Sequence, residues 1–310
     1  MTQNTVQPAT TSLSLTESRN PRSVYIDRQP TREIVRTFLN EDRSVFSAVE
    51  AAAEPIAQAV DRVVASFRQG GRLIYIGAGT SGRLAVLDAS ECPPTFGVTP
   101  DLVKALIAGG TEAIFQAREG SEDDREAAVM DLKEVGLRST DTVVGITASG
   151  TTPYVISGLA FAKGIGSGTI LLSCNPYGNR PEVDIHINPV VGPEVITGST
   201  RLKSGTACKI VLNMLSSISM IRIGKVYQNL MVDVRATNEK LRGRARRIVM
   251  EGAHTTPEHA DSCLSRAGGE VKLAIYLAKN GGTADEARQA LAAANGHLAV
   301  ALGEIDADDL

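Results

Sequence analysis

The 310-residue sequence lacks the features that mark several large classes of protein. Its four cysteines show neither a pairing pattern nor metal-ligand spacing, which argues against a disulfide framework and fits a reducing compartment. The four histidines show no ligand spacing either, so we expect no bound metal. No apolar run approaches the roughly 20 residues of a membrane span, and the first residues lack the charged-then-apolar pattern of a signal peptide. These absences predict a cytoplasmic protein.

A surplus of positive charge is also absent. The formal net charge is −3 and the pI is near 5.9, which argues against a nucleic-acid partner. One basic cluster, at 242–247, lies in a helical pattern, and we expect a solvated face or a subunit contact there. With 43% hydrophobic and 22% charged residues, the chain can bury a large core, and its length suits one large domain and a smaller one.

The middle of the chain alternates short apolar runs with helical patterns. Strands are expected at 73–76, 103–107, 142–147, 169–173 and 183–187. Apolar runs without a period of two are typical of strands buried on both faces of a parallel sheet. The alternation predicts an α/β fold with a doubly wound, mainly parallel five-stranded sheet in an αβα sandwich.

Helical patterns flank the predicted sheet. We expect helices at 31–39, capped by Thr31, and at 44–68, kinked at Pro55, then an apolar helix at 207–221. Three short helices are expected at 256–267, 269–279 and 283–294. The predicted segments are a disordered tail (1–15), an N-terminal helical arm (16–62), the α/β domain (63–226), connecting helices (227–250) and a small all-α C-terminal domain (251–310).

Two of the predicted strands end in loops rich in Gly, Ser and Thr, at 77–82 and 147–152. Ligands of open parallel sheets bind beyond the carboxyl ends of the strands. Each loop starts a helix, whose first N–H groups favour an anion such as phosphate. We therefore predict that the two loops together hold a phosphate and a neighbouring sugar hydroxyl.

The first loop also matches G-x-G-x-x-G, which is a weak signal alone. A dinucleotide site needs an acidic residue about 20 positions later, but the second strand ends in Ala108-Gly109-Gly110. A nucleoside triphosphate loop needs Gly-Lys-Ser/Thr, which does not occur there. A purely structural glycine turn stays open as the alternative.

Two glutamates are candidates for acid–base chemistry. Glu91 is expected just past a helix, because Pro93 and Pro94 follow it. Glu122 is expected at a helix start, beside two aspartates that can act as cap and first-turn acid. The ordinary alternatives are a surface loop acid and a solvated capping residue. If the fold brings both over one sheet edge, they can supply an acid and a base to one substrate.

Long ungapped motifs carry a family resemblance. The two hydroxyl-rich loops resemble the sugar isomerase (SIS) domain, a phosphosugar-binding fold. Within it, the chain resembles the N-acetylmuramic acid 6-phosphate etherase family through the segments 75–84, 87–97, 107–110, 119–123, 198–207 and 229–233. The likeness covers about residues 16–302. Ala85 stands where the family is expected to have glycine, and the N-terminal tail is longer and unrelated.

The resemblance implies cleavage of a sugar ether that gives N-acetylglucosamine 6-phosphate and D-lactate. It implies that Glu91 protonates the lactate oxygen and that Glu122 removes the proton from carbon 2. It also implies a homodimer that uses no cofactor, and a C-terminal fold of the ubiquitin-associated type. The phosphosugar-binding residues that it implies are Gly79, Thr80, Ser81, Thr147, Ser149, Gly150, Thr151, Thr152 and, as a further contact, Lys203.

Two rival functions use the same domain. One is a non-catalytic sugar-phosphate-sensing regulator similar to the glucokinase regulatory protein, which binds without turnover. The other is an aldose–ketose isomerase, which shares the ring opening and the base but has no lactyl pocket. The presence of Glu91 within Ser-Glu-Cys-Pro-Pro-Thr favours the lyase, because a sensor needs no acid there.

Overall fold

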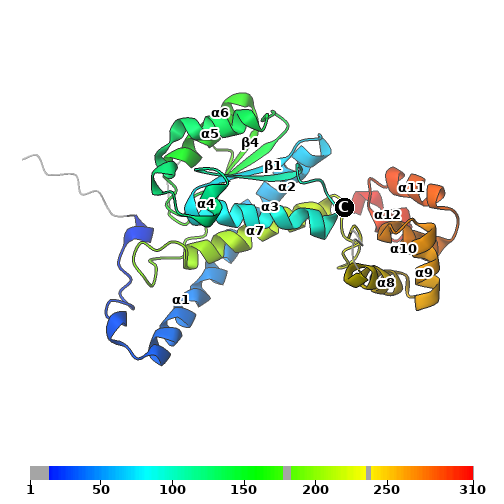
Figure 1. Cartoon of the computed structure of the whole chain (residues 1–310), viewed down its shortest axis with the longest axis horizontal. Coiled ribbons are helices and arrows are strands. Elements are labelled where there is room, and N and C mark those ends of the chain that lie inside the picture. Colours follow the sequence, from blue (N-terminus) through cyan, green and yellow to red (C-terminus); the bar gives the residue numbers. More distant parts are fainter. Residues whose placement is uncertain (1–13, 177–182, 235–238, 310) are drawn as a thin grey trace, which may run out of the picture.

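One parallel sheet between layers of helices organises the computed structural model, which describes residues 14–176, 183–234 and 239–309 (Figure 1). The strands are β1 (Leu73–Gly77), β2 (Val103–Ile107), β3 (Thr142–Ile146), β4 (Gly168–Leu172) and β5 (Ile185–Ile187). Their order is β2-β1-β3-β4-β5, and every pair is parallel. The predicted doubly wound, five-stranded α/β sheet is confirmed.

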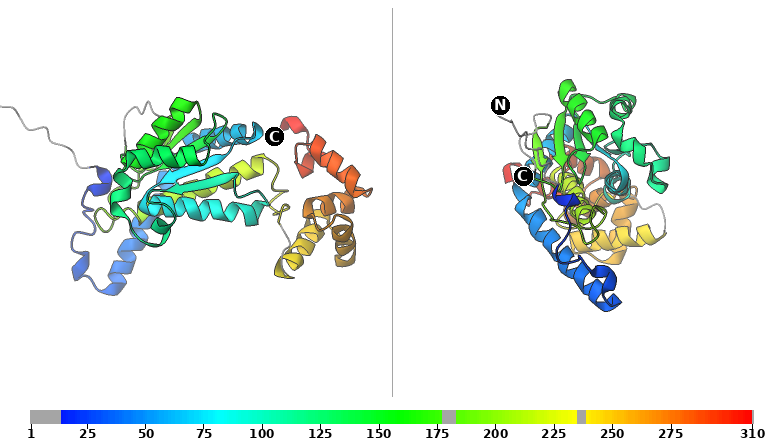
Figure 2. Two further views of the ribbon diagram at one scale, coloured as in Figure 1. Left: turned by 45° about the horizontal axis from the view of Figure 1, so that its top comes forward. Right: turned by 90° about the vertical axis from the view of Figure 1, so that its left-hand side faces the viewer.

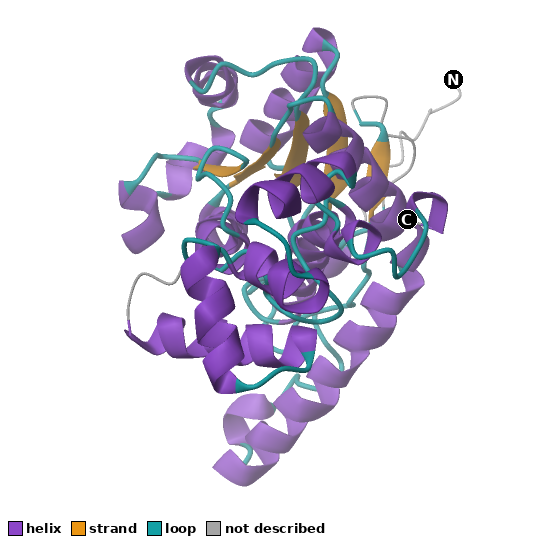
Figure 3. Ribbon diagram, turned by 90° about the vertical axis from the view of Figure 1, so that its right-hand side faces the viewer, coloured by secondary structure: helices purple, strands orange, loops and turns teal. Residues whose placement is uncertain are grey.

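Helices cover both faces of the sheet, as the view in Figure 3 shows. On one face lie α2 (Ala53–Arg68), α3 (Gly79–Phe96) and α7 (Lys203–Arg222), and on the other lie α5 (Arg125–Glu134) and α6 (Pro153–Ile165). Side chains alternate accordingly: Leu73 and Tyr75 pack with the first group, whereas Ile74 and Ile76 pack with the second. Both faces are therefore buried.

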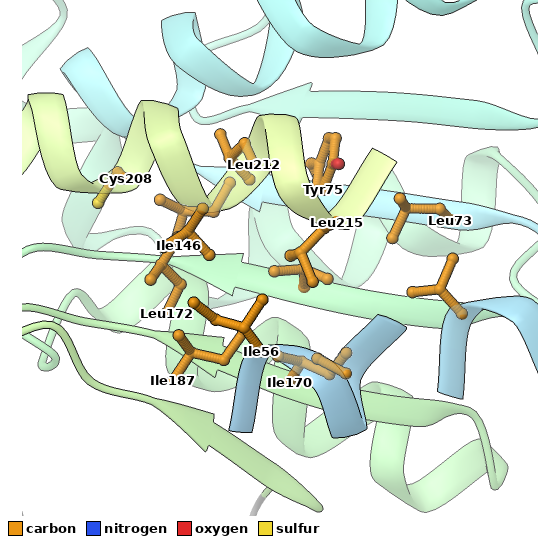
Figure 4. Packing of buried hydrophobic residues seen from close by; sticks show 14 of the residues in the cluster. Ile56, Leu73, Tyr75, Ile146, Ile170, Leu172, Ile187, Cys208, Leu212 and Leu215 are labelled. Atoms are coloured by element: carbon orange, nitrogen blue, oxygen red, sulfur yellow. The ribbon is translucent and has the colours of Figure 1, made fainter. Parts of the chain in front are cut away.

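Helix α7 is, in the described part of the chain, the one helix long and apolar enough to cross a membrane. It packs instead against the sheet, where Leu212 and Leu215 meet Tyr75 and Ile146 (Figure 4). More than half of its most apolar stretch is buried in the protein. Its composition is that of a core helix.

Two long helices precede the sheet, and their boundaries differ from the prediction. Helix α1 spans Thr31–Ala51 without interruption, and the break before α2 falls at Ala52. The polar residues 40–44 continue the helix instead of forming a loop, because Glu41 among them is buried and its carboxylate pairs with the Lys203 ammonium. Pro55 lies in the first turn of α2 rather than in a helix interior, and Thr31 is the first helical residue rather than the cap.

Helix α3 runs through both of its prolines, which corrects the expectation that it ends before them. Pro93 and Pro94 cannot donate backbone hydrogen bonds, yet the last turn persists because Cys92 and Phe96 are buried in the core. The helix ends at Gly97, whose N–H bonds the Pro93 carbonyl at 2.9 Å in a left-handed conformation. Glu91 therefore lies on a helix, not in a loop.

The C-terminal helices share a separate apolar cluster, which lies beyond one end of the sheet domain in the left view of Figure 2. The three predicted short helices are confirmed as α9, α10 and α11, with shifted ends. The division into five segments and the ubiquitin-associated resemblance stay predictions, and the predicted tail falls largely outside the described residues. The remaining elements are η1 (Leu15–Glu17), η2 (Ile26–Arg28), α4 (Glu112–Phe115), η3 (Glu119–Asp123), α8 (Glu239–Ala253), α9 (Pro257–Arg266), α10 (Val271–Asn280), α11 (Ala284–Ala293), α12 (Leu298–Ala301) and η4 (Ala307–Asp309).

Candidate active site

A cavity of about 590 Å³ lies at the carboxyl ends of β1 and β3. All the predicted phosphosugar-binding residues except Gly150 and Lys203 line it. The parallel register makes this possible, because Gly77 at the end of β1 is level with Ile146 at the end of β3. The lining residues are Glu17, Ala78, Gly79, Thr80, Ser81, Glu122, Asp123, Ile146, Thr147, Ala148, Ser149, Thr151, Thr152, Pro153, Gly198, Thr200, Gly205 and Cys208.

The glycines after β1 allow a sharp strand-to-helix turn. Gly79 begins α3 with a φ of +53°, a region that side-chain-bearing residues rarely adopt. A Cβ on Gly77 would lie 2.9 Å from the backbone nitrogen of Gly82, and a Cβ on Gly82 would lie 2.5 Å from the Ile107 side chain. The motif thus lets α3 start close against the strand ends, with its first turn facing the cavity.

The loop after β3 is tied together by its own hydroxyl groups. The Thr147 hydroxyl lies 2.8 Å from that of Thr152 and 3.2 Å from that of Ser149, and it accepts the Gly150 N–H at 3.1 Å. The Thr151 hydroxyl donates to Ser149 at 3.1 Å. Gly150 does not line the cavity, but its φ of +78° makes this tight loop possible. The loop therefore presents a preformed set of hydroxyls.

Two helix N-termini, those of α3 and α6, open onto the cavity. Neither receives a side-chain capping hydrogen bond from its N-cap residue, Ala78 or Thr152. By contrast, Asp124 caps α5, and the buried Glu194 carboxylate accepts the first N–H groups of α7. Uncapped N–H groups and the helix dipole favour an anion at this point. Among the described residues that line the cavity, there is no lysine, arginine or histidine.

Two carboxylates also line this cavity. Glu122 and Asp123 line it from η3, and both are exposed. Asp124 takes the capping role, accepting the backbone N–H groups of Glu126 and Ala127 at 3.1 and 2.9 Å. The Glu122 side chain makes no hydrogen bond or ion pair with another described residue, so its carboxylate is available to a ligand.

Glu91 does not line this cavity. It is exposed on α3, ten residues after Ser81, which places it about 15 Å further along the helix axis. A single copy of the chain therefore does not bring Glu91 and Glu122 to one cavity. The condition for a joint role, that the fold brings both glutamates over one sheet edge, is therefore not met within one chain.

A buried carboxylate holds the middle of α3 in place. Asp88 accepts hydrogen bonds from Tyr75 of β1 at 2.9 Å and from Asn213 and Ser216 of α7 at 2.7 and 3.1 Å. Burial raises the pKa of Asp88, and these three donors act against the rise. The contacts fix α3 between the sheet and α7, three residues before Glu91.

Lys203, expected as a substrate contact, points elsewhere. Its ammonium lies 2.9 Å from the Glu41 carboxylate, and both side chains are buried. Arg22 and Asn20 also donate to Glu41, and the Arg22 guanidinium, with Lys203 and Asn20, lowers the pKa of Glu41 to about 2. Lys203 therefore joins the N-terminal arm and α1 to the start of α7.

The structure adds residues that the sequence reasoning left out. Gly198 and Thr200 line the cavity from the segment before α7, and Gly205 lines it from the first turn of α7. The glycines and hydroxyls of this stretch are the same signal as in the other two loops. Glu17 lines it from η1, and nothing in its local sequence indicates a site. No cluster of three or more potential metal ligands occurs in the described ranges.

Comparison with known proteins decides the family. Residues 55–163 match a family model described as the glucokinase regulatory protein N-terminal SIS domain. The chain is 56% identical over 289 residues to the N-acetylmuramic acid 6-phosphate etherase of Rhizobium rhizogenes, covering 93% of this chain and 94% of that protein. It is 53% identical over 292 residues to the etherase of Clostridium beijerinckii, covering 94% and 96%. The chain belongs to the N-acetylmuramic acid 6-phosphate etherase family.

Among solved structures, a phosphoheptose isomerase from Francisella tularensis resembles this etherase-family chain with a TM-score of 0.50. The two are 18% identical, and the match covers 62% of this chain and 100% of the other. At this identity the likeness concerns the fold alone. The predicted SIS-type sheet domain and the predicted etherase family are both confirmed.

Proposed function

We propose that this chain cleaves the D-lactyl ether of N-acetylmuramic acid 6-phosphate as a carbon–oxygen lyase, a step in cell-wall sugar recycling. Relatives that carry this name match almost the whole chain, which supports the activity. The structural observation that supports it most is one cavity that contains both an anion seat, formed by the uncapped, hydroxyl-lined N-termini of α3 and α6, and the carboxylate of Glu122, which has no partner among the described residues.

The 6-phosphate is proposed to lie between the turns after β1 and β3. The hydroxyls of Thr80, Ser81, Ser149 and Thr151 and the first N–H groups of α3 and α6 supply neutral donors there. Such a seat selects a tetrahedral phosphate dianion through the positions of its hydrogen-bond donors rather than through ion pairs. The sugar then extends towards Glu122.

Glu122 is proposed as the base at carbon 2. In the ring-opened aldehyde the adjacent carbonyl acidifies this carbon, so a carboxylate can take its proton. The electron pair forms the carbon 2–carbon 3 double bond, and the carbon 3–oxygen bond to the lactyl group breaks. Water later adds hydroxyl to carbon 3 and a proton to carbon 2. The net change is the addition of one water, which requires proton transfers and no redox partner.

The departing lactate oxygen needs a proton, and Glu91 is proposed to supply it from a second copy of the chain. The distance along α3 excludes Glu91 from the cavity of its own copy. Leu87, one turn earlier, is 51% exposed although apolar, and a homodimer would cover it. An apolar groove of about 550 Å³ between α1, α2 and α7, bordered by the exposed Phe46, also suits a second copy.

All four cysteines are free and buried, in keeping with the proposed cytoplasmic location.

Incubation with N-acetylmuramic acid 6-phosphate and an assay for D-lactate test the function directly. Lactate release is expected from the lyase, binding without turnover from a sensor, and a ketose without lactate from an isomerase. Glu122→Gln is expected to abolish both lactate release and the exchange of the carbon 2 proton with deuterated water. Glu126→Gln, an exposed neighbour on α5, serves as the matched control and is expected to keep both.

A further inference from the structure

The N-terminal arm forms a fixed wall of the cavity. Thr16 is fully buried: its N–H donates to the Asn175 side chain at 3.1 Å, and its hydroxyl accepts from the same amide at 2.8 Å. Asn175 in turn donates to the Ser149 carbonyl at 3.2 Å, in the hydroxyl-rich loop. Ser23 donates to the Val195 carbonyl at 2.7 Å. The arm is therefore bonded to two loops that line or adjoin the cavity.

This anchoring sets the position of Glu17, the next residue after Thr16. Its side chain lines the cavity beside Gly198, where a Cβ would lie 3.2 Å from a Glu17 carboxylate oxygen. Gly198 has a φ of +75°, so a side chain is disfavoured there and the space beside Glu17 stays open. The Glu17 backbone N–H donates to the Ser14 carbonyl at 2.9 Å, but its side chain makes no hydrogen bond or ion pair with another described residue. A carboxylate that has no partner among the described residues, and whose backbone is anchored, thus faces the cavity.

The chemistry of a carboxylate limits what it can bind. It accepts hydrogen bonds and donates none, so it repels a phosphate and the carboxylate of a lactyl group. The groups on the sugar that can donate to it are the free hydroxyls and the acetamido N–H. The proposed mechanism gives Glu17 no part in proton transfer, and the phosphate seat does not need it.

We propose that Glu17 is a substrate-binding residue that accepts hydrogen bonds from the donor-bearing edge of the sugar. It thereby selects a neutral, hydroxylated edge and rejects a ligand with a second anionic group at that point. This inference rests on the proposed function, since it places a sugar phosphate in the same cavity. It also makes the N-terminal arm a specificity element of the site.

Calorimetric binding of two probes, inorganic phosphate and N-acetylglucosamine 6-phosphate, tests the inference. A hydrogen bond to a charged group is lost in Glu17→Gln, so we expect affinity for the sugar phosphate to fall about tenfold or more. Affinity for inorganic phosphate should stay the same or rise, because a negative charge near the seat is removed. Glu17→Asp should recover part of the loss. Asp27→Asn, an exposed acid on the same arm, is the matched control and should change neither affinity.

The outcomes separate this inference from the proposed function. If the wild-type protein binds no sugar phosphate and releases no lactate, the proposed function fails and the inference fails with it. If the wild-type protein binds and turns over while Glu17→Gln binds the sugar phosphate equally well, the inference alone is overturned. An equal loss for both probes would also overturn it, because that result indicates a displaced arm rather than a lost sugar contact.

Discussion

Lys203 and Glu41 form an ion pair that is closed to solvent. The Lys203 ammonium lies 2.9 Å from the Glu41 carboxylate, and their side chains are 0% and 2% exposed. The pair joins α1 to the first residue of α7, directly after the segment that carries the cavity residues Gly198 and Thr200. A residue that the family resemblance suggests as a substrate contact therefore acts in the support of the site.

Lys203→Met is expected to lower the free energy of unfolding by about 3 kcal/mol, because it leaves a buried carboxylate with one cation fewer. The retained contact from Arg22 places this value at the lower end of the range for broken buried pairs. Urea denaturation measures it. Lys209→Met, exposed on the same helix, should change stability by less than about 0.5 kcal/mol. If Lys203→Met instead weakens substrate binding without changing stability, Lys203 is a substrate contact.

Glu41 should also contribute to the loss of stability in acid. Its folded-state pKa is lowered to about 2, below the ordinary value of 4.5, so its stabilising contribution is present above pH 4.5 and disappears as the pH falls towards 2. Glu41→Gln should therefore be less stable than wild type at neutral pH and should lose stability less steeply between pH 4.5 and 2. Denaturation curves across this range measure both effects. If the free energy of unfolding of Glu41→Gln falls with pH as steeply as that of wild type, the role of Glu41 is contradicted. Glu33→Gln, at an exposed position of α1, is the control and should leave the pH dependence of wild type unchanged.

The anion seat can be tested without any sugar. Ser81→Ala removes one hydroxyl at the start of α3, and we expect the affinity for inorganic phosphate to fall about tenfold. Ser90→Ala is the matched control, because Ser90 lies on the exposed face of the same helix and donates only to the Leu87 carbonyl among the described residues. Phosphate affinity that responds equally to both changes would argue against a seat at the N-terminus of α3.

A site shared by two copies predicts that two inactive variants restore activity when mixed. Glu91→Gln keeps its own Glu122, and Glu122→Gln keeps its own Glu91, so a mixed dimer contains one cavity with both carboxylates intact. With random pairing, half of the dimers are mixed and each has one complete site, which gives about one quarter of wild-type lactate release. Unfolding and refolding the two variants together allows the exchange. Activity that stays at the level of the separate variants would contradict a shared site.

Local patterns in the sequence predict the sheet and the two hydroxyl-rich loops that line the cavity well. The β2 strand has the predicted ends, 103 and 107, and the first loop follows from Gly77, Gly79 and Gly82, whose conformation and close packing demand glycine. These features depend on residues that are neighbours in the chain. Their consequence, a cavity at the carboxyl ends of β1 and β3, then follows from the parallel register.

The remaining parts of the site depend on contacts between distant residues. Thr16 meets Asn175 across 159 positions, and Lys203 meets Glu41 across 162, so neither the place of Glu17 nor the role of Lys203 has a local signal. The prolines after Glu91 are misleading for a related reason. Their local cost to the helix is outweighed by the burial of Cys92 and Phe96 against the rest of the fold.

The seat between α3 and α6 contains hydroxyls and amides but, among the described lining residues, no cation. A doubly charged phosphate ester at this seat would be held by neutral donors and helix N-termini rather than by ion pairs. The proposed reaction leaves the phosphate ester untouched, so N-acetylglucosamine 6-phosphate would meet the same donors at this seat as the substrate does. The proposed phosphate seat would therefore contribute equally to the binding of substrate and product, and any difference in affinity between them would come from contacts with the sugar and the lactyl group.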